Sequence, residues 1–284
     1  VCAIVSAGGK WPVSEETCDK GSVIILSAED GAEDTIVPRL KAVSADLENI
    51  HIVHAVKLGN GKERAFDLTR DVEQLRYTLN SIENVRLVVV DPISAYLGKT
   101  DSHRNSEVRA ALTPAIEFAE EIGACLLCVT HLNKGGQGNA LSRVTGSIAF
   151  TAAARASFSV TRDNDDHDLR LMLPLKNNLA KDTHGFGYRI EEKNLSGIDT
   201  SCVTWEKATV NLSAEDVLID QCVRSENRGK AEEFLMNELA DGLEIPSNEL
   251  YKRAEDMGIS KKVLWSIKDK LGVQVRKKGY QGQW

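Results

Sequence analysis

The segment Arg86–Leu97, RLVVVDPISAYL, constrains the fold of this chain more than any other stretch. Four aliphatic residues in a row precede Asp91 and Pro92, so apolar side chains occupy every position instead of every second one. Such a run predicts a strand buried on both faces, as in a parallel sheet covered by helices. An acidic residue at the carboxyl end of such a strand lies where open α/β sheets bind ligands. Asp91 is therefore a candidate binding residue; the alternative is a core strand ending in a helix-capping aspartate.

Three other predicted strands also end on polar residues. They are Val23–Ala28 before Glu29 and Asp30, Cys125–Thr130 before His131, and Leu169–Leu175 before Lys176. Apolar residues recur every three or four positions over Asp71–Ile82 and Ser106–Ile122, which predicts amphipathic helices between the strands. Strands alternating with helices form a parallel sheet, and right-handed crossovers bring the strand ends to one edge. We therefore expect an α/β fold whose polar strand ends line one edge and favour a phosphate and metal site.

Composition narrows the class of protein. The 284 residues suffice for one α/β domain and a small module, and 42% hydrophobic with 27% charged residues is ordinary for a globular protein. No apolar run approaches the ~20 residues that span a membrane, and no signal peptide is visible, so no membrane partner is expected. The six cysteines lack the spacings of a disulfide framework, which indicates reduced thiols and the cytoplasm.

The end of the chain combines helical patterns with basic residues. A helix over Ala231–Leu239 is followed by a helix over Ser247–Met257, a Ser260-capped helix over Lys261–Leu271 and an alternating segment, Val273–Arg276. This order predicts a small C-terminal winged helix-turn-helix domain.

The net charge of −7 is unevenly distributed, because the segment from 261 to 278 has a single acidic residue, Asp269. Its basic residues are Lys261, Lys262, Lys268, Lys270, Arg276, Lys277 and Lys278. An acidic body with a basic tail predicts local contact with duplex DNA. A solvated basic helix face and a protein-binding surface are the alternatives.

These patterns divide the chain into three parts. An α/β core is expected over residues 1–206 and the winged-helix domain over residues 229–284. Between them, residues 207–228 are expected to form a polar connector with a short helix near 214–219. Short strands over Tyr188–Glu191 and Cys202–Glu206 are expected to close the core. Val1–Ala7 has the pattern of a helix that ends at Gly8, so we expect a first strand and the start of this helix to lie upstream.

With these residues in view, the core resembles the RecA-type ATPases, and among them the plasmid RepA-type hexameric replicative helicases and their phage and bacterial relatives. The segments that carry the resemblance are VIILSAEDGAEDTIVPRL (Val23–Leu40), LVVVDPISAYLG (Leu87–Gly98), CVTHLNKGG (Cys128–Gly136) and NALSRVTGSIAFTAAAR (Asn139–Arg155). They look like the second strand, the Walker B strand, the sensor strand, and the loop and helix that follow it. The ending from Gly258 onward is also similar to that of this group.

The resemblance implies a role for each residue at the sheet edge. Glu29 would orient or deprotonate the attacking water, with Asp30 beside it in the nucleotide site. Asp91 would bind Mg²⁺ through water, and His131 would sense the γ-phosphate of ATP. Lys176 resembles a cation that reaches the nucleotide of a neighbouring subunit. The alternatives are solvated surface side chains for Glu29 and Lys176, and a hydrogen-bonded strand-end histidine for His131.

The glycine-rich loop Asn133–Arg143 carries Lys134 and Arg143. In RecA-type rings the equivalent loops face single-stranded DNA, and the resemblance implies the same contact here. A flexible connection between two elements is the alternative.

The chain departs from the family at the phosphate-binding loop. A nucleotide site of this class uses GxxxxGK[ST], and no such segment occurs in the chain. Gly8-Gly9-Lys10 has neither the spacing nor the following Ser or Thr. The family places this loop about one helix upstream of the LSAED strand, so we expect the chain to be a fragment whose phosphate loop lies before Val1.

Two functions are compatible with these residues. The first is an ATP-hydrolysing, Mg²⁺-dependent motor of DNA replication or recombination, a homo-oligomeric ring when complete, with single-stranded DNA at the core loop and duplex DNA at the C-terminal module. The second is a non-motor regulatory protein that binds DNA and uses nucleotide only as a switch. Glu29, Asp91 and His131 together favour the motor, because a switch does not need a carboxylate that activates water.

Overall fold

The computed structural model describes residues 1–53, 56–57, 63–79, 81–98, 100, 104–131, 148–180 and 184–276. The chain divides into two compact units, residues 1–215 and 216–284. The first unit contains a parallel sheet flanked by helices together with an antiparallel sheet, which confirms the predicted α/β class. The second unit is helical over its described residues.

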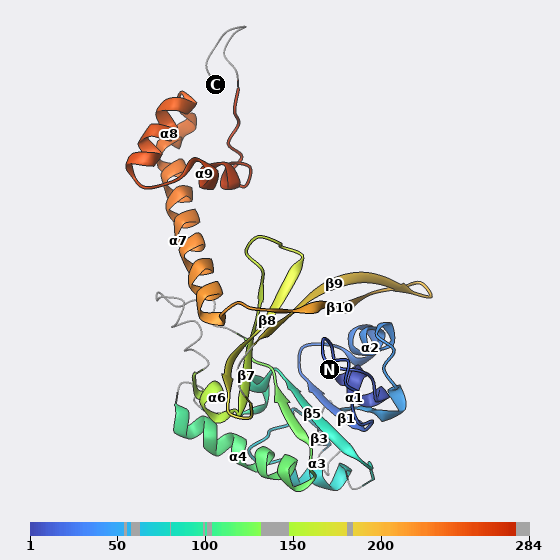
Figure 1. Ribbon diagram of the computed structural model, residues 1–284. Coiled ribbons are helices and arrows are strands. Elements are labelled where there is room, and N and C mark those ends of the chain that lie inside the picture. Colours follow the sequence, from blue (N-terminus) through green and yellow to red (C-terminus); the bar gives the residue numbers. More distant parts are fainter. Residues whose placement is uncertain are drawn as a thin grey trace. The chain divides into compact units, whose positions relative to one another are not determined.

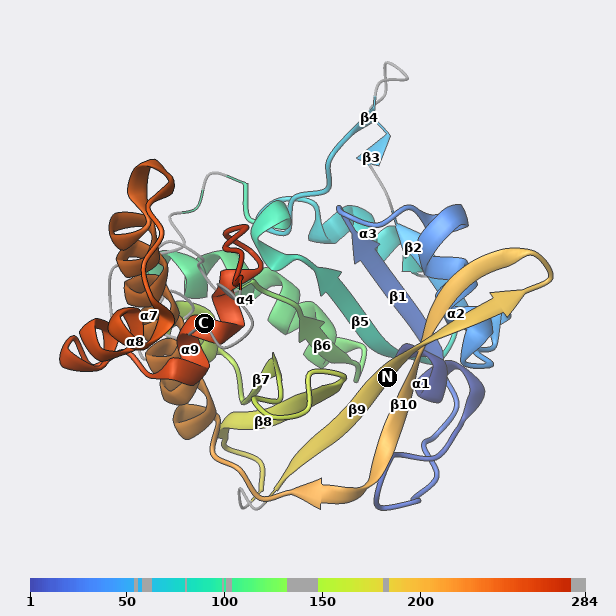
Figure 2. The same cartoon turned by 90° about the horizontal axis from the view of Figure 1, so that it is seen from above.

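The parallel sheet has four strands in the order β2-β1-β5-β6, and Figure 2 shows them side by side. The strands are β1 (Ser22–Ser27), β2 (Ile50–Val53), β5 (Val85–Asp91) and β6 (Cys125–Cys128). β1 and β6 both pair in parallel with β5, with Ser27 opposite Asp91 and Cys128 opposite Val90. The aliphatic run before Asp91 is therefore an internal strand, as its continuous apolar pattern predicts.

Side chains of β1 and β5 alternate between two hydrophobic layers. Ile24 and Val90 lie in one layer, and both are fully buried. This layer is covered by α3 (Val72–Leu79) and α4 (Asn105–Glu121). Both helices confirm the predicted 3.6-residue periodicity, and on α4 Val108 and Phe118 point into the core.

The opposite layer contains Val23 and Val89 and is covered by α1 (Cys2–Ala7) and α2 (Val37–Ala42). α1 ends at Gly8, which adopts the left-handed conformation (φ 67°) that glycine tolerates best. The backbone N–H of Gly21, just before β1, donates to the carbonyl of Val5 near the end of α1 (3.0 Å). The carboxyl end of α1 therefore lies beside the start of β1.

A short segment before α3 contains a buried ion pair. The strands β3 (Val56–Lys57) and β4 (Glu63–Arg64) form a two-stranded sheet just upstream. Asp71 is 1% exposed and accepts two hydrogen bonds from the Arg64 guanidinium and one from the backbone of Asp67. The Arg64 hydrogen bonds hold the pKa of Asp71 below its usual value. The pairing satisfies a carboxylate that would be costly to bury alone.

A second, antiparallel sheet has the order β10-β9-β8-β7, and its strands are labelled in Figure 1. They are β7 (Ala156–Arg162), β8 (Leu169–Asn177), β9 (Gly185–Leu195) and β10 (Ile198–Val210). The prediction that 169–175 joins the parallel sheet is wrong, because β8 pairs antiparallel with β7 and β9. The two short closing strands are parts of the longer hairpin β9–β10, whose residue Lys193 donates to the Ala42 carbonyl at the end of α2 (2.6 Å).

Short helical segments complete the first unit: η1 (Ala32–Ile36), η2 (Leu47–Asn49), η3 (Ile93–Tyr96) and α6 (Ile148–Ala153). The second unit contains α7 (Ala214–Glu238) from Asp216 onward, followed by η4 (Ala240–Gly242), α8 (Ser247–Asp256) and α9 (Lys261–Lys268). Its core contains Phe234, Leu235, Ala254, Leu264 and Ile267.

Two expectations about this part of the chain need correction. The short helix expected near 214–219 continues to Glu238, so most of the predicted connector is helical. Residues 273–276, expected to form the strand of a wing, carry no strand. Helices are present at the two predicted places, as α8 and α9, and Ser260 caps α9 by accepting a hydrogen bond from the Val263 N–H.

Candidate active site at the carboxyl ends of the parallel strands

The carboxyl ends of three parallel strands bring Glu29, Asp91 and His131 together. Glu29 follows β1, Asp91 is the last residue of β5, and His131 follows β6. His131 Nε2 lies 3.3 Å from Glu29 Oε2, although 102 residues separate them in sequence. Backbone hydrogen bonds hold the strand ends level: Ala28 N–H donates to the Asp91 carbonyl (3.0 Å) and Val129 N–H to the Val90 carbonyl (2.9 Å). The predicted convergence of these three residues at one edge is therefore present.

Asp91 lies in an unfavourable environment for a negative charge. Burial raises its pKa from the usual aspartate value, and the charges of Glu29 and Asp30 raise it further, whereas His131 lowers it. Tyr96, 2% exposed at the end of η3, has a pKa raised to about 12 by burial and by the Asp91 charge. Neighbouring carboxylates that destabilise one another are typical of sites that bind a cation or transfer a proton.

Glu29 and Asp30 are adjacent in sequence and yet have different partners. The Asp30 carboxylate accepts from Arg39 NH1 on α2 (2.9 Å), and its backbone N–H donates to Ser27 Oγ (3.3 Å). The Glu29 carboxylate contacts the His131 imidazole, and the Glu29 side chain is 56% exposed. Asp30 therefore stabilises the turn after β1, and Glu29 is an exposed carboxylate at the edge of the sheet.

Sequence analysis missed Ser27 and Arg39 as parts of this turn. A serine at a strand end followed by acidic residues is a recognisable signal, because its hydroxyl accepts hydrogen bonds from nearby N–H groups. Arg39 offered no comparable signal, because its approach to Asp30 depends on the path of η1 between them.

Lys176 forms its hydrogen bonds at the end of α6 and not with Glu29, Asp91 or His131. It lies within β8, opposite Ser157 of β7. Its Nζ donates to the carbonyls of Thr151, Ala152 and Ala154 (3.2, 3.0 and 2.7 Å) at the end of α6. These carbonyls lack intrahelical partners, so the ammonium acts as a C-terminal cap. Its suggested contact with a neighbouring subunit's nucleotide stays a prediction.

The residues predicted to contact DNA fall into two groups. Lys134, Arg143, Lys277 and Lys278 lie outside the residues that the structure describes. Lys261, Lys262, Lys268 and Arg276 belong to the second unit, at or after α9. Lys261 and Lys262 are exposed, whereas the Lys268 side chain is only 23% exposed.

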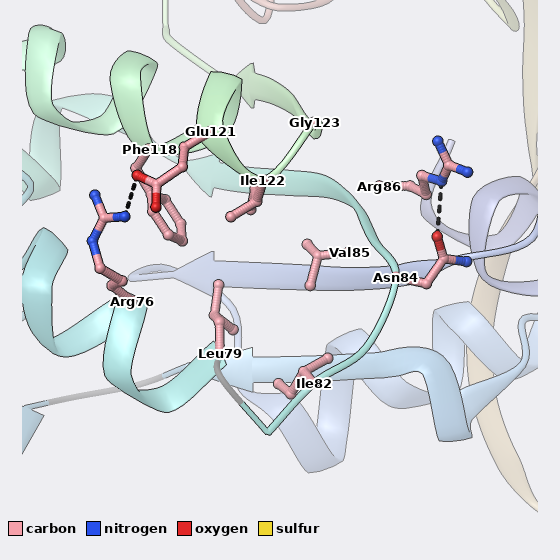
Figure 3. A pocket seen from close by; sticks show the side chains of 10 residues that line it. All are labelled: Arg76, Leu79, Ile82, Asn84, Val85, Arg86, Phe118, Glu121, Ile122 and Gly123. Carbon is pink, nitrogen blue, oxygen red and sulfur yellow. Dashed lines mark hydrogen bonds and ion pairs between the residues drawn. The ribbon is translucent and has the colours of Figure 1, made fainter.

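A cavity of about 390 Å³ lies at the opposite edge of the parallel sheet, near Val85 at the start of β5 (Figure 3). Arg76 of α3 forms an ion pair with Glu121 of α4 across its mouth, and the Arg76 guanidinium lies 5.3 Å from the centroid of the Phe118 ring. The cavity is therefore separate from the edge that carries Glu29 and Asp91.

The donor set at the sheet edge suits a magnesium ion that also has phosphate and water ligands. Within the described ranges, no group of three or more His, Cys, Asp or Glu side chains is arranged to hold a metal by itself. Mg²⁺ commonly takes only one or two protein carboxylates and completes its shell with phosphates and water. Asp91 is the carboxylate placed to do this.

Residues 1–137 match the family model described as an AAA domain. The match supports an AAA-type P-loop ATPase family for this part of the chain, which contains Glu29, Asp91 and His131. It thereby suggests a nucleotide-binding function of the ATPase type, and such families use nucleotide and metal. No curated protein matches the chain.

Among the helices that the structure describes, none combines the length and the apolar character needed to cross a membrane.

Proposed function

We propose that this chain is the core of an ATP-hydrolysing motor that acts on DNA, similar to the RepA-type hexameric helicases of the RecA fold. The observation that carries the proposal is the meeting of Glu29, Asp91 and His131 at the carboxyl ends of three parallel strands. Open α/β sheets bind ligands at this edge. The AAA-domain match over residues 1–137 adds independent support for nucleotide chemistry.

Each residue has a distinct task in this proposal. Phosphoryl transfer to water requires a positioned nucleophile and neutralised charge, with little covalent chemistry by the protein. Glu29, which is exposed and has no arginine partner among the described residues, orients water and accepts its proton. Asp91 holds Mg²⁺ through water, and the metal neutralises phosphate charge when bound. Asp30 keeps the turn in place through Arg39.

His131 couples the nucleotide to Glu29. In the structure its Nε2 lies 3.3 Å from the Glu29 carboxylate. A γ-phosphate at this edge competes with Glu29 for the imidazole, and a histidine that turns toward the phosphate frees the carboxylate for water. His131 precedes the loop containing Lys134 and Arg143, so the proposal also has it relay the state of the nucleotide to single-stranded DNA.

The chain contains no GxxxxGK[ST] segment, the loop that cradles phosphates in nucleotide sites of this class. We propose that residues encoded upstream of Val1 supply a strand and this loop. One feature supports the idea: β6 pairs on one side alone among the described strands, which leaves an edge for one more.

DNA is the proposed partner of both units. The basic residues around α9 favour contact with duplex DNA, and a ring of identical subunits would surround a single strand at the loop with Lys134 and Arg143. A non-motor regulator that uses nucleotide only as a switch is the competing function. The two functions differ in one property: the motor should hydrolyse ATP faster in the presence of single-stranded DNA, and the switch should not.

The decisive test replaces Glu29 by Gln in the polypeptide that includes the phosphate loop. Loss of the base is expected to lower the rate of ATP hydrolysis by about 10²–10⁴-fold, and ATP affinity is expected to stay within a few fold, because the amide preserves shape. Glu33→Gln, the same change four residues downstream, is the matched control and should hydrolyse ATP normally. Parental hydrolysis by Glu29→Gln would refute the assigned role. Hydrolysis that single-stranded DNA never stimulates would favour the switch.

A further inference from the structure

Helix α9 has one buried and one exposed face. Leu264 and Ile267 are 3% and 5% exposed in the core of the second unit. With 3.6 residues per turn, Lys262 and Trp265 lie on the other side of the helix, and Lys261 lies at the flank between the two faces. Both lysines are exposed, and Trp265 is 44% exposed. We call these three residues the α9 face.

The lysines of this region differ in the charge they can offer to a partner. Lys268 Nζ lies 2.6 Å from Asp269 and 4.7 Å from the centroid of the Trp265 ring. Lys270 forms an ion pair with Glu232 of α7 (3.0 Å). Lys262 has no charged partner among the described residues. The ammonium of Lys261 lies over the Tyr251 ring (4.4 Å), which leaves its charge uncompensated by any described carboxylate.

The stability of α9 does not explain this arrangement. Two lysines occupy its first turn, which has no acidic residue, and cations there oppose the helix dipole. A large indole exposed between lysines also contributes little to the core. Lys268, tied to Asp269, holds the Trp265 ring from one side, so the indole is positioned and not free to fold back. Exposed, positioned aromatic residues with uncompensated cations are typical of binding surfaces.

We propose that the α9 face is the surface that contacts duplex DNA, with Lys261 and Lys262 at phosphates and the Trp265 indole packed against the sugars or base edges. Lys268 is a positioning residue for Trp265 and does not contact phosphate. Charge complementarity selects the partner, because the face carries cations and no carboxylate. This inference rests on the DNA-binding part of the proposed function and assigns its contacts to particular residues.

The first experiment measures binding of the full chain to a fluorescent 20-base-pair duplex over a range of salt concentrations. Trp265→Ala is expected to weaken binding roughly five- to tenfold, from the loss of apolar contact area, and to leave the salt dependence unchanged. Trp265→Phe should lie between the two, because it keeps an aromatic ring. Circular dichroism checks that both variants fold. We expect them to fold, because the Trp265 side chain is partly exposed.

The second experiment distinguishes a lysine that contacts phosphate from a lysine whose charge is neutralised within the protein. Lys262→Ala is expected to reduce the slope of log affinity against log salt by about 0.9, the value for one lost phosphate contact with duplex DNA. Lys270→Ala is the matched control: it removes the same charge from a lysine that Glu232 neutralises, and the slope should not change. Lys268→Ala should weaken DNA binding as much as Trp265→Ala does, again without changing the slope of log affinity against log salt. When Lys268→Ala is combined with Trp265→Ala, affinity should fall little further than with Trp265→Ala alone.

Each outcome has a defined meaning. Parental affinity for Trp265→Ala, or equal slopes for Lys262→Ala and Lys270→Ala, would refute the α9 face while the parental chain still binds duplex. If the parental chain binds no duplex at low salt, the DNA-binding part of the proposed function fails as well, and the module is a protein-binding domain. ATP hydrolysis, tested separately through Glu29, is affected by neither result.

Discussion

At the scale of single residues, the candidate active site is a place where function opposes stability. Asp91 ends a strand whose other residues are almost all buried, and Glu29 and Asp30 are close enough to raise its pKa. A carboxyl whose pKa rises on folding binds its proton more tightly in the folded state. It therefore favours folding below the unfolded-state pKa, and this contribution is lost as the pH rises through the raised, folded-state pKa.

Replacing Asp91 by Asn is accordingly expected to raise the free energy of unfolding at pH 7 by about 0.5–2 kcal/mol, the usual range for relief of such strain. The gain should shrink as the pH falls, because the parental Asp91 then becomes neutral too. Urea denaturation at several pH values measures it, with Asp19→Asn, at an exposed position, as the control for loss of one charge. A variant less stable than the parent at pH 7 would contradict the argument.

The residues of the site differ in how far sequence could identify them. Asp91 and Glu29 follow uninterrupted apolar runs, and this position alone indicates the carboxyl end of a buried strand. Arg39 could not be identified, because its contact with Asp30 is made across η1 and α2. Local periodicity specifies which face of an element is buried, and it contains no information on pairs formed when elements meet.

At the scale of elements, Lys176 shows what a strand assignment alone leaves out. The apolar pattern of 169–175 correctly indicates a strand, and yet the same pattern fits a parallel or an antiparallel neighbour. In the structure the strand is antiparallel, and its lysine caps α6 through three carbonyls. The hairpin β9–β10 had one usable signal, Ser196-Gly197, where both residues have positive φ (54° and 93°) as tight hairpin turns require.

If the cap is the main role of Lys176, Lys176→Met should lower the free energy of unfolding by about 1.5–3 kcal/mol, the usual value for hydrogen bonds to a charged group. Methionine keeps the length of the side chain and removes the donor. Lys207→Met, on the exposed surface of β10, serves as the control and should have little effect. Unchanged stability together with a loss of ATP hydrolysis in the complete protein would instead support the contact with a neighbouring nucleotide.

At the scale of the whole molecule, the candidate active-site residues and the basic helix lie in different units. The first unit carries the carboxylates and the histidine, and the second carries the basic helix. The concentration of basic residues after Lys261 indicated this division in the sequence. The boundary itself was harder to predict, because it falls in the first turn of α7, which runs as one helix from Ala214 through the expected connector to Glu238. Ala214, Val217 and Leu218 are buried at helical spacing and indicate the short helix that was expected, whereas residues 224–228 are all polar and carry no such signal.

The sequence contains no GxxxxGK[ST] segment, and this leads to a prediction for the chain as a whole. Without such a loop, the proposed site would hold a nucleotide only through a magnesium ion at Asp91. A GxxxxGK[ST] loop would add several backbone hydrogen bonds of about 1 kcal/mol each, which together tighten binding by roughly 10²–10³-fold. Calorimetric titration of the 284-residue chain with Mg–ATP is therefore expected to show no saturation below about 1 mM, whereas the polypeptide extended upstream through this loop should saturate in the micromolar range. Asp91→Asn in the extended polypeptide controls for the metal contact and should bind nucleotide less tightly in the presence of Mg²⁺. Micromolar binding by the present chain would show that its phosphate site lies elsewhere.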